Sequence, residues 1–206
     1  MTETAEHQGT TDEQLARRAQ EGCARSFETL VMRFQVPLLH FLRTRCPAPA
    51  DAEDLLQETF LRAYRRLQLY DPRRRFGTWL YTMAYRLSIN HVRKARPSVD
   101  TARMAHLASP DRSPVDQLIM AETQDKLWQS ARELLTDRQF TVLWLHCVEQ
   151  MAPAEIARVV RASGVSVRAA LYRARKKLLP HLEAAQCGDE MTPTRRGVIG
   201  AKLCNT

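Results

Sequence analysis

Apolar residues recur at helical spacing along most of the chain, and this periodicity is the main indication of its fold. In the first half, a stripe spaced four, three and four residues apart consists of Leu56, Phe60, Ala63 and Leu67. The same spacing returns further on in Val167, Leu171, Ala174 and Leu178. Asn-Gly and Asp-Gly pairs, which are strong hairpin signals, do not occur. The pattern therefore predicts an all-α protein with two small helical domains.

The first helical block is predicted to span residues 11–96. One helix should begin near Asp12 and end at Gly22, because glycine just after a periodic segment is typical of a helix end. A second helix should run from about Ser26 to Arg45, since two prolines follow and close it.

Two more helices complete this block. Asp51 is expected to cap the third, with Asp54 three residues further on as in a capping box. The outer face of that helix is Asp54, Gln57, Glu58, Leu61 and Arg65. The pattern breaks between residues 70 and 76, and the fourth helix should begin near Thr78. Its two stripes are Leu80, Ala84, Leu87 and His91 on one side and Thr82, Arg86, Asn90 and Arg93 on the other.

The periodicity fades between residues 97 and 113, where prolines and small polar residues predict an exposed, flexible linker. The second block is predicted over residues 114–183, starting with a helix that reaches about Leu134. A capping box of Thr136 and Gln139 opens the next helix. The inward stripe of that helix is Phe140, Leu143, Trp144 and Cys147. Residues 184–206 are expected to form a mobile tail.

The segment between Pro153 and Leu178 has the outline of a helix-turn-helix, with Ile156, Val159 and Val160 inward on the short helix. Six residues between Arg161 and Lys177 are basic and none is acidic. Such a face suits the phosphate-lined major groove of DNA. The residues expected at DNA are Ser166, Arg168, Ala169, Tyr172, Arg173 and Lys176. A solvated basic face, a repressor and the output domain of a response regulator fit the same pattern.

The composition narrows the class of protein. The formal net charge of +8 at pH 7 favours a polyanionic partner. No stretch approaches the roughly 18 consecutive apolar residues of a membrane helix, so direct membrane insertion is not expected. The polar, acidic first residues are unlike a secretory signal. The five cysteines are scattered without a C-x-x-C pair, which predicts a reducing, cytoplasmic location and no metal site.

Sequence motifs for catalysis are missing. The chain has no glycine-rich phosphate loop, no H-E-x-x-H and no G-x-S-x-G. Glu53 and Asp54 are adjacent and therefore lie on different helical faces, which does not suit a pair of catalytic carboxylates. We expect no catalytic residue, no cofactor and no small-molecule substrate.

Several segments together resemble the sigma factors of bacterial RNA polymerase. The segments Ala52–Tyr64 and Phe76–Arg93 are similar to the polymerase-binding and promoter-melting helices of sigma region two. Leu135–Gln139, Glu155–Ala157 and Ser166–Arg175 are similar to sigma region four. Their order in one short chain, with no third sigma domain between them, resembles the extracytoplasmic-function (ECF) group.

The resemblance implies partners and roles. Core RNA polymerase should bind Asp54, Gln57 and Glu58. The minus-ten promoter element should meet Arg73, Arg74, Arg75, Phe76, Trp79, Arg86, Asn90 and Arg93. Trp79 or Tyr81 should be buried, and the other aromatic rings are candidates for stacking on unpaired bases. The last helix should read the minus-thirty-five element, and an anti-sigma factor is expected to hold the protein inactive.

The sequence departs from the family pattern at three positions near the helix-turn-helix. Arg161 occupies a turn position commonly held by glycine, which puts the turn geometry in question. Ala170 stands where arginine is frequent, which predicts a weaker phosphate clamp, and Ala152 replaces a hydroxyl N-cap.

The alternative function is a stand-alone helix-turn-helix regulator, which needs a dimer surface and a palindromic site. Such a regulator has no reason to carry the segment 52–93. We therefore expect a sigma factor that is not an enzyme and that directs core RNA polymerase to promoters.

Overall fold

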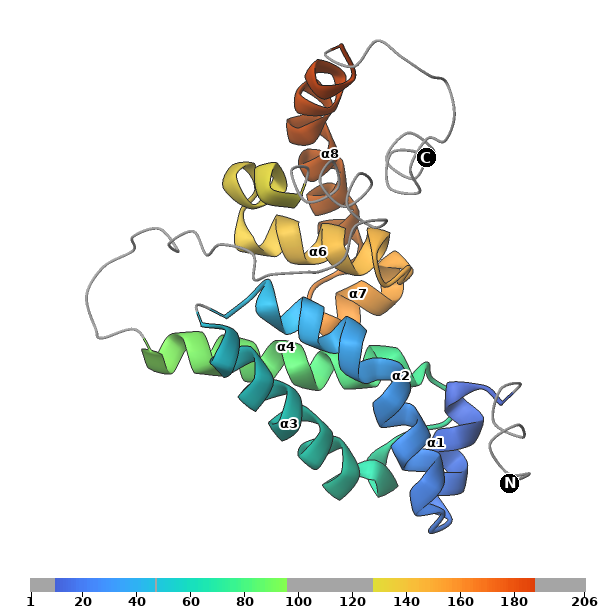
Figure 1. The fold of residues 1–206 in the computed structure, drawn as a ribbon. Helices are drawn as coiled ribbons and strands as arrows, with labels where there is room; N and C mark the ends of the chain where they lie inside the picture. Colours follow the sequence, from blue (N-terminus) through green and yellow to red (C-terminus); the bar gives the residue numbers. More distant parts are fainter. Residues whose placement is uncertain (1–9, 47, 96–127, 188–206) are drawn as a thin grey trace. The chain divides into compact units, whose positions relative to one another are not determined.

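The computed structural model describes residues 10–46, 48–95 and 128–187, and within these ranges the chain forms helices and turns with no strand (Figure 1). The chain divides into two compact units, Met1–Ala108 and Ser109–Thr206. The predicted all-α fold with two helical domains is therefore confirmed. The predicted linker, residues 97–113, lies outside the described residues.

The first unit contains α1 (Asp12–Gln20), α2 (Ala24–Arg43), α3 (Pro49–Arg65), the short 3-10 helix η1 (Leu67–Leu69) and α4 (Phe76–Ala95). Helix α2 packs against α1, α3 and α4, and α1 also contacts η1 and α4. The fully buried side chains at the centre of the unit are Leu15, Leu30, Leu38, Phe41, Leu42, Phe76 and Leu80.

Local sequence explains most of the helix ends in this unit. Thr11 caps α1 through a capping box with Gln14, and Gly22 takes a φ of +101°, which lets the chain turn tightly into α2. The expected cap at Asp51 was wrong, because α3 begins at Pro49 with Ala48 as its N-cap. Proline at the first helical position has a suitable φ and lacks an N–H that would need a partner. Asp51 instead pairs with His91 of α4 at 3.2 Å.

The buried face of α3 also differs from the prediction. Its buried residues are Ala52, Leu55, Thr59 and Ala63, whereas Leu56 and Phe60 are only half-buried. Small side chains allow α3 to approach its neighbours closely, and the larger apolar residues are left at the margin. Both stripes fit a helical period, so periodicity alone did not separate them.

The second unit contains helical residues 128–134, α6 (Asp137–Cys147), α7 (Pro153–Val159) and α8 (Gly164–Cys187). The predicted capping box is present, since Gln139 N donates to Thr136 Oγ1 at 3.3 Å and Thr136 N donates to Gln139 Oε1 at 3.1 Å. Helix α8 extends through residues 184–187, which the sequence analysis assigned to the tail. The rest of that tail lies outside the described residues.

The core of the second unit agrees with the predicted stripes. The four apolar residues predicted to face inward on α8, from Val167 to Leu178, are all buried, as are Ile156, Val159 and Val160. On α6, Phe140, Leu143 and Cys147 are buried. Trp144 is half-buried, and the centroid of its ring lies 4.8 Å from that of Trp128. No helix within the described ranges is long and apolar enough to span a membrane.

Candidate nucleic-acid interface

The turn between α7 and α8 forms although it lacks the usual glycine. Arg161 adopts the left-handed conformation with a φ of +50°. The turn is supported by Ala162 N, which donates to Ala157 O at 2.9 Å. A left-handed conformation costs a non-glycine residue roughly 1–2 kcal/mol, which the packing of α7 and α8 can offset. At Ala152, which replaces a hydroxyl N-cap, half of a capping box remains, since Glu155 Oε2 accepts from Ala152 N at 2.8 Å.

The start of α8 is held by two hydrogen bonds that involve Ser166. Its backbone N–H donates to Ser163 Oγ at 3.1 Å, so Ser163 caps the helix. Its hydroxyl accepts from Arg138 Nη2, also at 3.1 Å, which brings a cation of α6 to the N-terminus of α8. Arg138 was not predicted at this site, because in the sequence it stands only as an inner residue of the capping box from Thr136 to Gln139.

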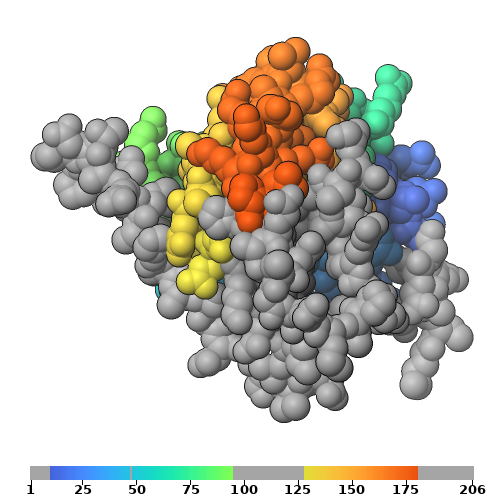
Figure 2. Space-filling view, turned by 90° about the horizontal axis from the view of Figure 1, so that it is seen from above, coloured from blue at the N-terminus to red at the C-terminus, as the bar shows by residue number. Residues whose placement is uncertain are grey.

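The outer face of α8 carries most of the residues predicted to meet DNA. Arg168, Tyr172, Arg173 and Lys176 are exposed, and Ser166 and Ala169 are half-buried beside them. The space-filling view shows atoms of α8, coloured orange to red, at the surface of their unit (Figure 2). This surface, which we call the α8 face, combines cations with one exposed ring.

Not every basic residue of α8 belongs to that face. Arg175 is half-buried, with Nη2 3.5 Å from His146 Nε2, and Lys177 donates to Leu134 O at 3.2 Å. Ala170 is 3% exposed, so its side chain faces the interior of the unit. An arginine at position 170 would have to leave that interior, which explains why alanine fits here.

In the first unit, α4 presents a polar face opposite its buried stripe. Arg86, Asn90 and Arg93 are exposed, at a spacing of four and three residues that puts them on one side. Leu80, Ala84 and Leu87 are buried on the other side, as predicted, and His91 is half-buried.

The loop of residues 70–75, which we call the arginine loop, precedes α4. Arg73, Arg74 and Arg75 are all exposed. Asp71 shapes the loop, since its Oδ1 accepts from Arg73 N at 3.0 Å and its Oδ2 lies 3.5 Å from Arg74 Nε. Three cations on one turn give a concentrated positive charge beside the start of α4.

The aromatic residues near this loop correct one expectation. Phe76 is fully buried, and its ring lies 5.4 Å from that of Tyr70 and 5.6 Å from that of Trp79. In this structure Phe76 cannot stack on a base. It anchors the end of the loop, because exposing its ring would lose the favourable free energy of burying apolar surface. Tyr81 and Tyr85 are also buried, and Trp79 is half-buried.

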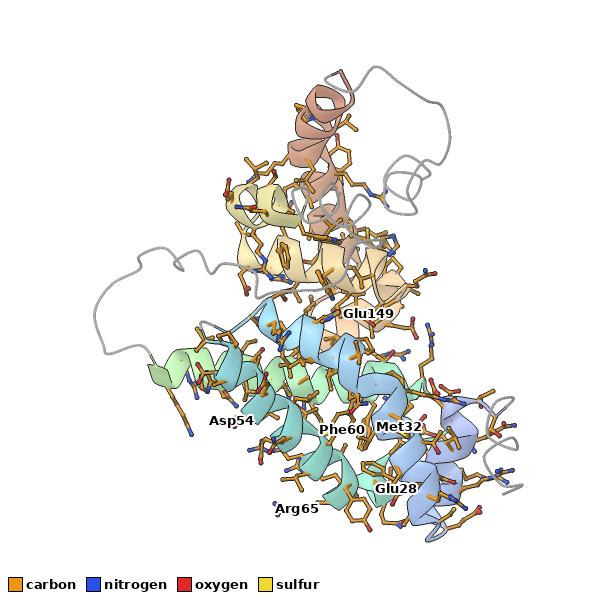
Figure 3. The ribbon with its side chains drawn as sticks, viewed as in Figure 1. Glu28, Met32, Asp54, Phe60, Arg65 and Glu149 are labelled. Atoms are coloured by element: carbon orange, nitrogen blue, oxygen red, sulfur yellow. The ribbon has the colours of Figure 1, made fainter. Side chains whose placement is uncertain are left out.

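The three residues predicted at core polymerase lie on the outer side of α3. Asp54 and Gln57 are exposed, and Glu58 is half-buried and paired with Arg62. Figure 3 shows Asp54, Phe60 and Arg65 along α3 and Met32 on the neighbouring α2.

Exposed apolar side chains accompany these polar residues. Leu61 and Tyr64 of α3 are 51% and 57% exposed, and Met32 of α2 is 72% exposed. Neither Met32 nor Tyr64 was predicted as a site residue. Exposed apolar residues such as Leu61 and Tyr64, on the helix that carries the three polar residues, are typical of protein interfaces.

The cysteines and acids of the described ranges do not form a metal site, since no group of three potential ligands lies together there. Burial raises the pKa of Cys46 to about 11, assisted by the nearby Asp51 carboxylate. Cys23 is exposed and accepts a hydrogen bond from Ser26 Oγ at 3.2 Å, which lowers its pKa.

Comparisons with known proteins match the two units separately. The Sigma-70 region 2 family matches residues 30–97, and the Sigma-70 region 4 family matches residues 127–178. The RNA polymerase sigma-H factor of Pseudomonas aeruginosa is 31% identical over 81% of this chain and 91% of its own length. The ECF RNA polymerase sigma factor BldN of Streptomyces coelicolor is 32% identical over 80% of this chain, which spans 63% of BldN.

A solved structure is similar over most of the chain. It is CnrH in complex with the cytosolic domain of CnrY, with a TM-score of 0.62 and 26% identity over 84% of this chain and 97% of CnrH. The similarity covers the segments that form both units.

Proposed function

This chain belongs to the ECF group of sigma-70 RNA polymerase sigma factors, and from that premise we propose how its two units divide promoter recognition. Sigma factors are transcription initiation factors that direct core RNA polymerase to promoters. We assign the minus-ten element to the unit of residues 11–96 and the minus-thirty-five element to the unit of residues 114–183. The observation that carries the assignment is the exposed, one-signed α8 face on a helix-turn-helix.

Core polymerase binds the outer side of α3 through Asp54, Gln57 and Glu58 in this proposal. Exposed carboxylates and an amide suit an arginine-bearing partner, because charge-assisted hydrogen bonds are stronger than neutral ones. The exposed Leu61 and Tyr64 on the same helix supply apolar area around these polar contacts.

The minus-ten element is bound by the arginine loop and by Arg86, Asn90 and Arg93 of α4. The loop cations hold the strand backbone, and the α4 side chains contact the opened strand. Trp79 remains a candidate for base stacking because it is only half-buried, whereas the fully buried Phe76 is assigned to packing.

The minus-thirty-five element is read by the α8 face in the major groove. Arg168 and Arg173 are suited to guanine or phosphate, Lys176 to phosphate, and Tyr172 and Ala169 to apolar contact. We add Arg138, because its guanidinium lies at Ser166 and so approaches the same groove.

Catalysis, location and regulation complete the proposal. Core polymerase carries out nucleotide transfer, and this chain contributes no active site, cofactor or small-molecule substrate. It acts in the cytoplasm, where the polymerase is. An anti-sigma factor holds it inactive by covering its binding surfaces; the complex of CnrH with CnrY supports this regulation by a second protein.

Reconstituted transcription tests the division of roles. The purified chain is combined with core polymerase on a library of genomic fragments, and the starting transcripts are mapped. We expect start sites that share two sequence elements. Arg173→Ala should weaken the dependence of transcription on the upstream, minus-thirty-five element, and Asn90→Ala should affect its dependence on the downstream, minus-ten element. A stand-alone regulator would bind a palindrome tightly without core polymerase, and that result would overturn the proposal.

A further inference from the structure

We propose that α1 is a positioning element for promoter opening, in which Gln20 and Glu13 hold the two ends of the arginine loop. This inference rests on the proposed minus-ten role of that loop. The matched Sigma-70 region 2 begins at residue 30, so it does not include α1.

Gln20 fastens the start of the loop. Its Nε2 donates to Leu67 O and to Tyr70 O, both at 2.8 Å, so both amide hydrogens are used. Gln68 Nε2 donates back to Gln20 O at 2.8 Å. The side chain thus links α1 to both ends of the segment 67–70, which contains η1.

Glu13 fastens the end of the loop. Its Oε1 accepts from Phe76 N at 3.2 Å, at the first residue of α4. A carboxylate is favoured there because the first N–H groups of a helix have no intrahelical partner and carry partial positive charge. Phe76 directly follows Arg75, the last of the three loop arginines, so this bond holds the chain at the point where the loop ends.

Helix α1 is itself rigidly held, which allows it to act as a support. Leu15 and Ala16 are completely buried, and Asp12 pairs with Arg33 of α2 at 2.7 Å. Gln20 and Glu13 therefore connect the loop to α2 through a short, fixed helix. Within the loop, Tyr70 OH donates to Arg74 O and adds an internal brace.

The electrostatics of the loop explain why such support matters. Arg73, Arg74 and Arg75 are consecutive, exposed and of like charge, so their repulsion favours a spread of conformations. Ordering that spread when DNA binds costs conformational entropy. A loop whose backbone is already fixed at both ends binds the strand at a lower entropic cost, and its arginines meet the strand in one register.

Three variants and one control test the proposal in holoenzyme made from the full chain and core polymerase. Gln20→Glu replaces the donor by a carboxylate that faces two carbonyl oxygens. Glu13→Gln keeps an acceptor for Phe76 N, whereas Glu13→Leu removes it. Glu21→Gln is the matched control, because Glu21 is exposed and pairs only with Arg17 in the described contacts.

The readouts are affinity for core polymerase, affinity for a single-stranded minus-ten oligonucleotide, and opening of a duplex promoter. We expect Gln20→Glu and Glu13→Leu to weaken oligonucleotide binding and promoter opening about tenfold or more. Each variant loses hydrogen bonds whose free energy corresponds to a change of this size. Core affinity should stay within about twofold, and Glu13→Gln and Glu21→Gln should behave as wild type.

Two outcomes overturn the inference. One is unchanged strand binding and opening in Gln20→Glu and Glu13→Leu; the other is an equal loss of core affinity, which would indicate a merely structural role. If Gln20→Glu does not fold, the comparison of Glu13→Leu with Glu13→Gln decides alone. Failure of the wild-type holoenzyme to recognise any promoter would instead contradict the proposed function.

Discussion

Arg45, just beyond the end of α2, donates from Nε to Ser88 Oγ of α4 at 2.7 Å. Its guanidinium carbon also lies 4.7 Å from the centroid of the Tyr85 ring. Arg45 is only 5% exposed and Ser88 is fully buried, so the contact sits inside the first unit. It fixes α4, the proposed promoter helix, against α2.

We predict that Ser88→Ala destabilises the first unit by about 1–3 kcal/mol, because it removes a buried partner of a guanidinium. Urea unfolding followed by circular dichroism measures the change. Asn90→Ala, two residues away and exposed, is the control and should change stability by less than about 0.5 kcal/mol. Equal stability of the two variants would refute the role assigned to this contact.

On the α8 face, Arg173→Ala and Lys176→Ala should each weaken holoenzyme binding to a promoter. If each contacts one phosphate, the slope of log affinity against log salt falls by roughly 1 per substitution. Arg158→Ala on α7 is the matched control, since Arg158 is exposed but lies outside the α8 face. A slope that stays at the wild-type value in both α8 variants would argue against the phosphate assignment.

Arg138→Ala should reduce dependence on the minus-thirty-five element by about tenfold, a magnitude typical of a lost guanidinium contact at DNA. In a double-mutant cycle with Ser166→Ala, the two effects should not add, because Arg138 and Ser166 are hydrogen-bonded. Promoter titrations with and without the upstream element provide the data. Additive effects would mean that the contact plays no part in recognition.

Thiol labelling should distinguish Cys23 from Cys46. The thiolate is the reactive form, so raising the pKa of Cys46 to about 11 from 9.0 cuts its thiolate fraction at pH 7.5 by roughly a hundredfold. Cys23 has a lowered pKa and is exposed. Iodoacetamide should therefore modify Cys23 first, and its rate should level off at a lower pH than that of Cys46.

The control for this prediction is Ser26→Ala, which removes the hydrogen bond to Cys23 Sγ. Peptide mass spectrometry should show slower labelling of Cys23 at pH 7.5 in that variant. Faster labelling of Cys46 than of Cys23 in the native protein would contradict the assigned burial.

The sequence predicted the parts of the fold that depend on local chemistry. The capping box at Thr136 and the buried stripe of α8 follow from residue type and spacing, and both occur in the structure. The register of α3 was missed, because a choice between Leu55 and Leu56 depends on the helices packed against it.

In the candidate site, too, local sequence predicted some features, whereas long-range packing decided others. The exposed cations of α8 and α4 could be predicted because they lie opposite apolar stripes. Phe76 and Arg138 could not be placed correctly. The ring of Phe76 packs 5.6 Å from that of Phe34, which is distant in sequence, and Arg138 reaches Ser166 across the unit. The resemblance to a family supplied roles, and the long-range contacts decided which side chains are available for them.

The central claim is that core polymerase holds this chain through the outer side of α3. The most direct test is the equilibrium affinity of the purified full chain for core polymerase, compared with Asp54→Lys and with Glu53→Lys. Glu53 is the matched control, since it is an exposed acid of the same helix that pairs with Arg43.

We predict tight association of the wild type, a loss of about tenfold or more for Asp54→Lys, and a change below about threefold for Glu53→Lys. If the wild-type chain, purified away from any inhibitor, does not associate with core polymerase, the account is contradicted.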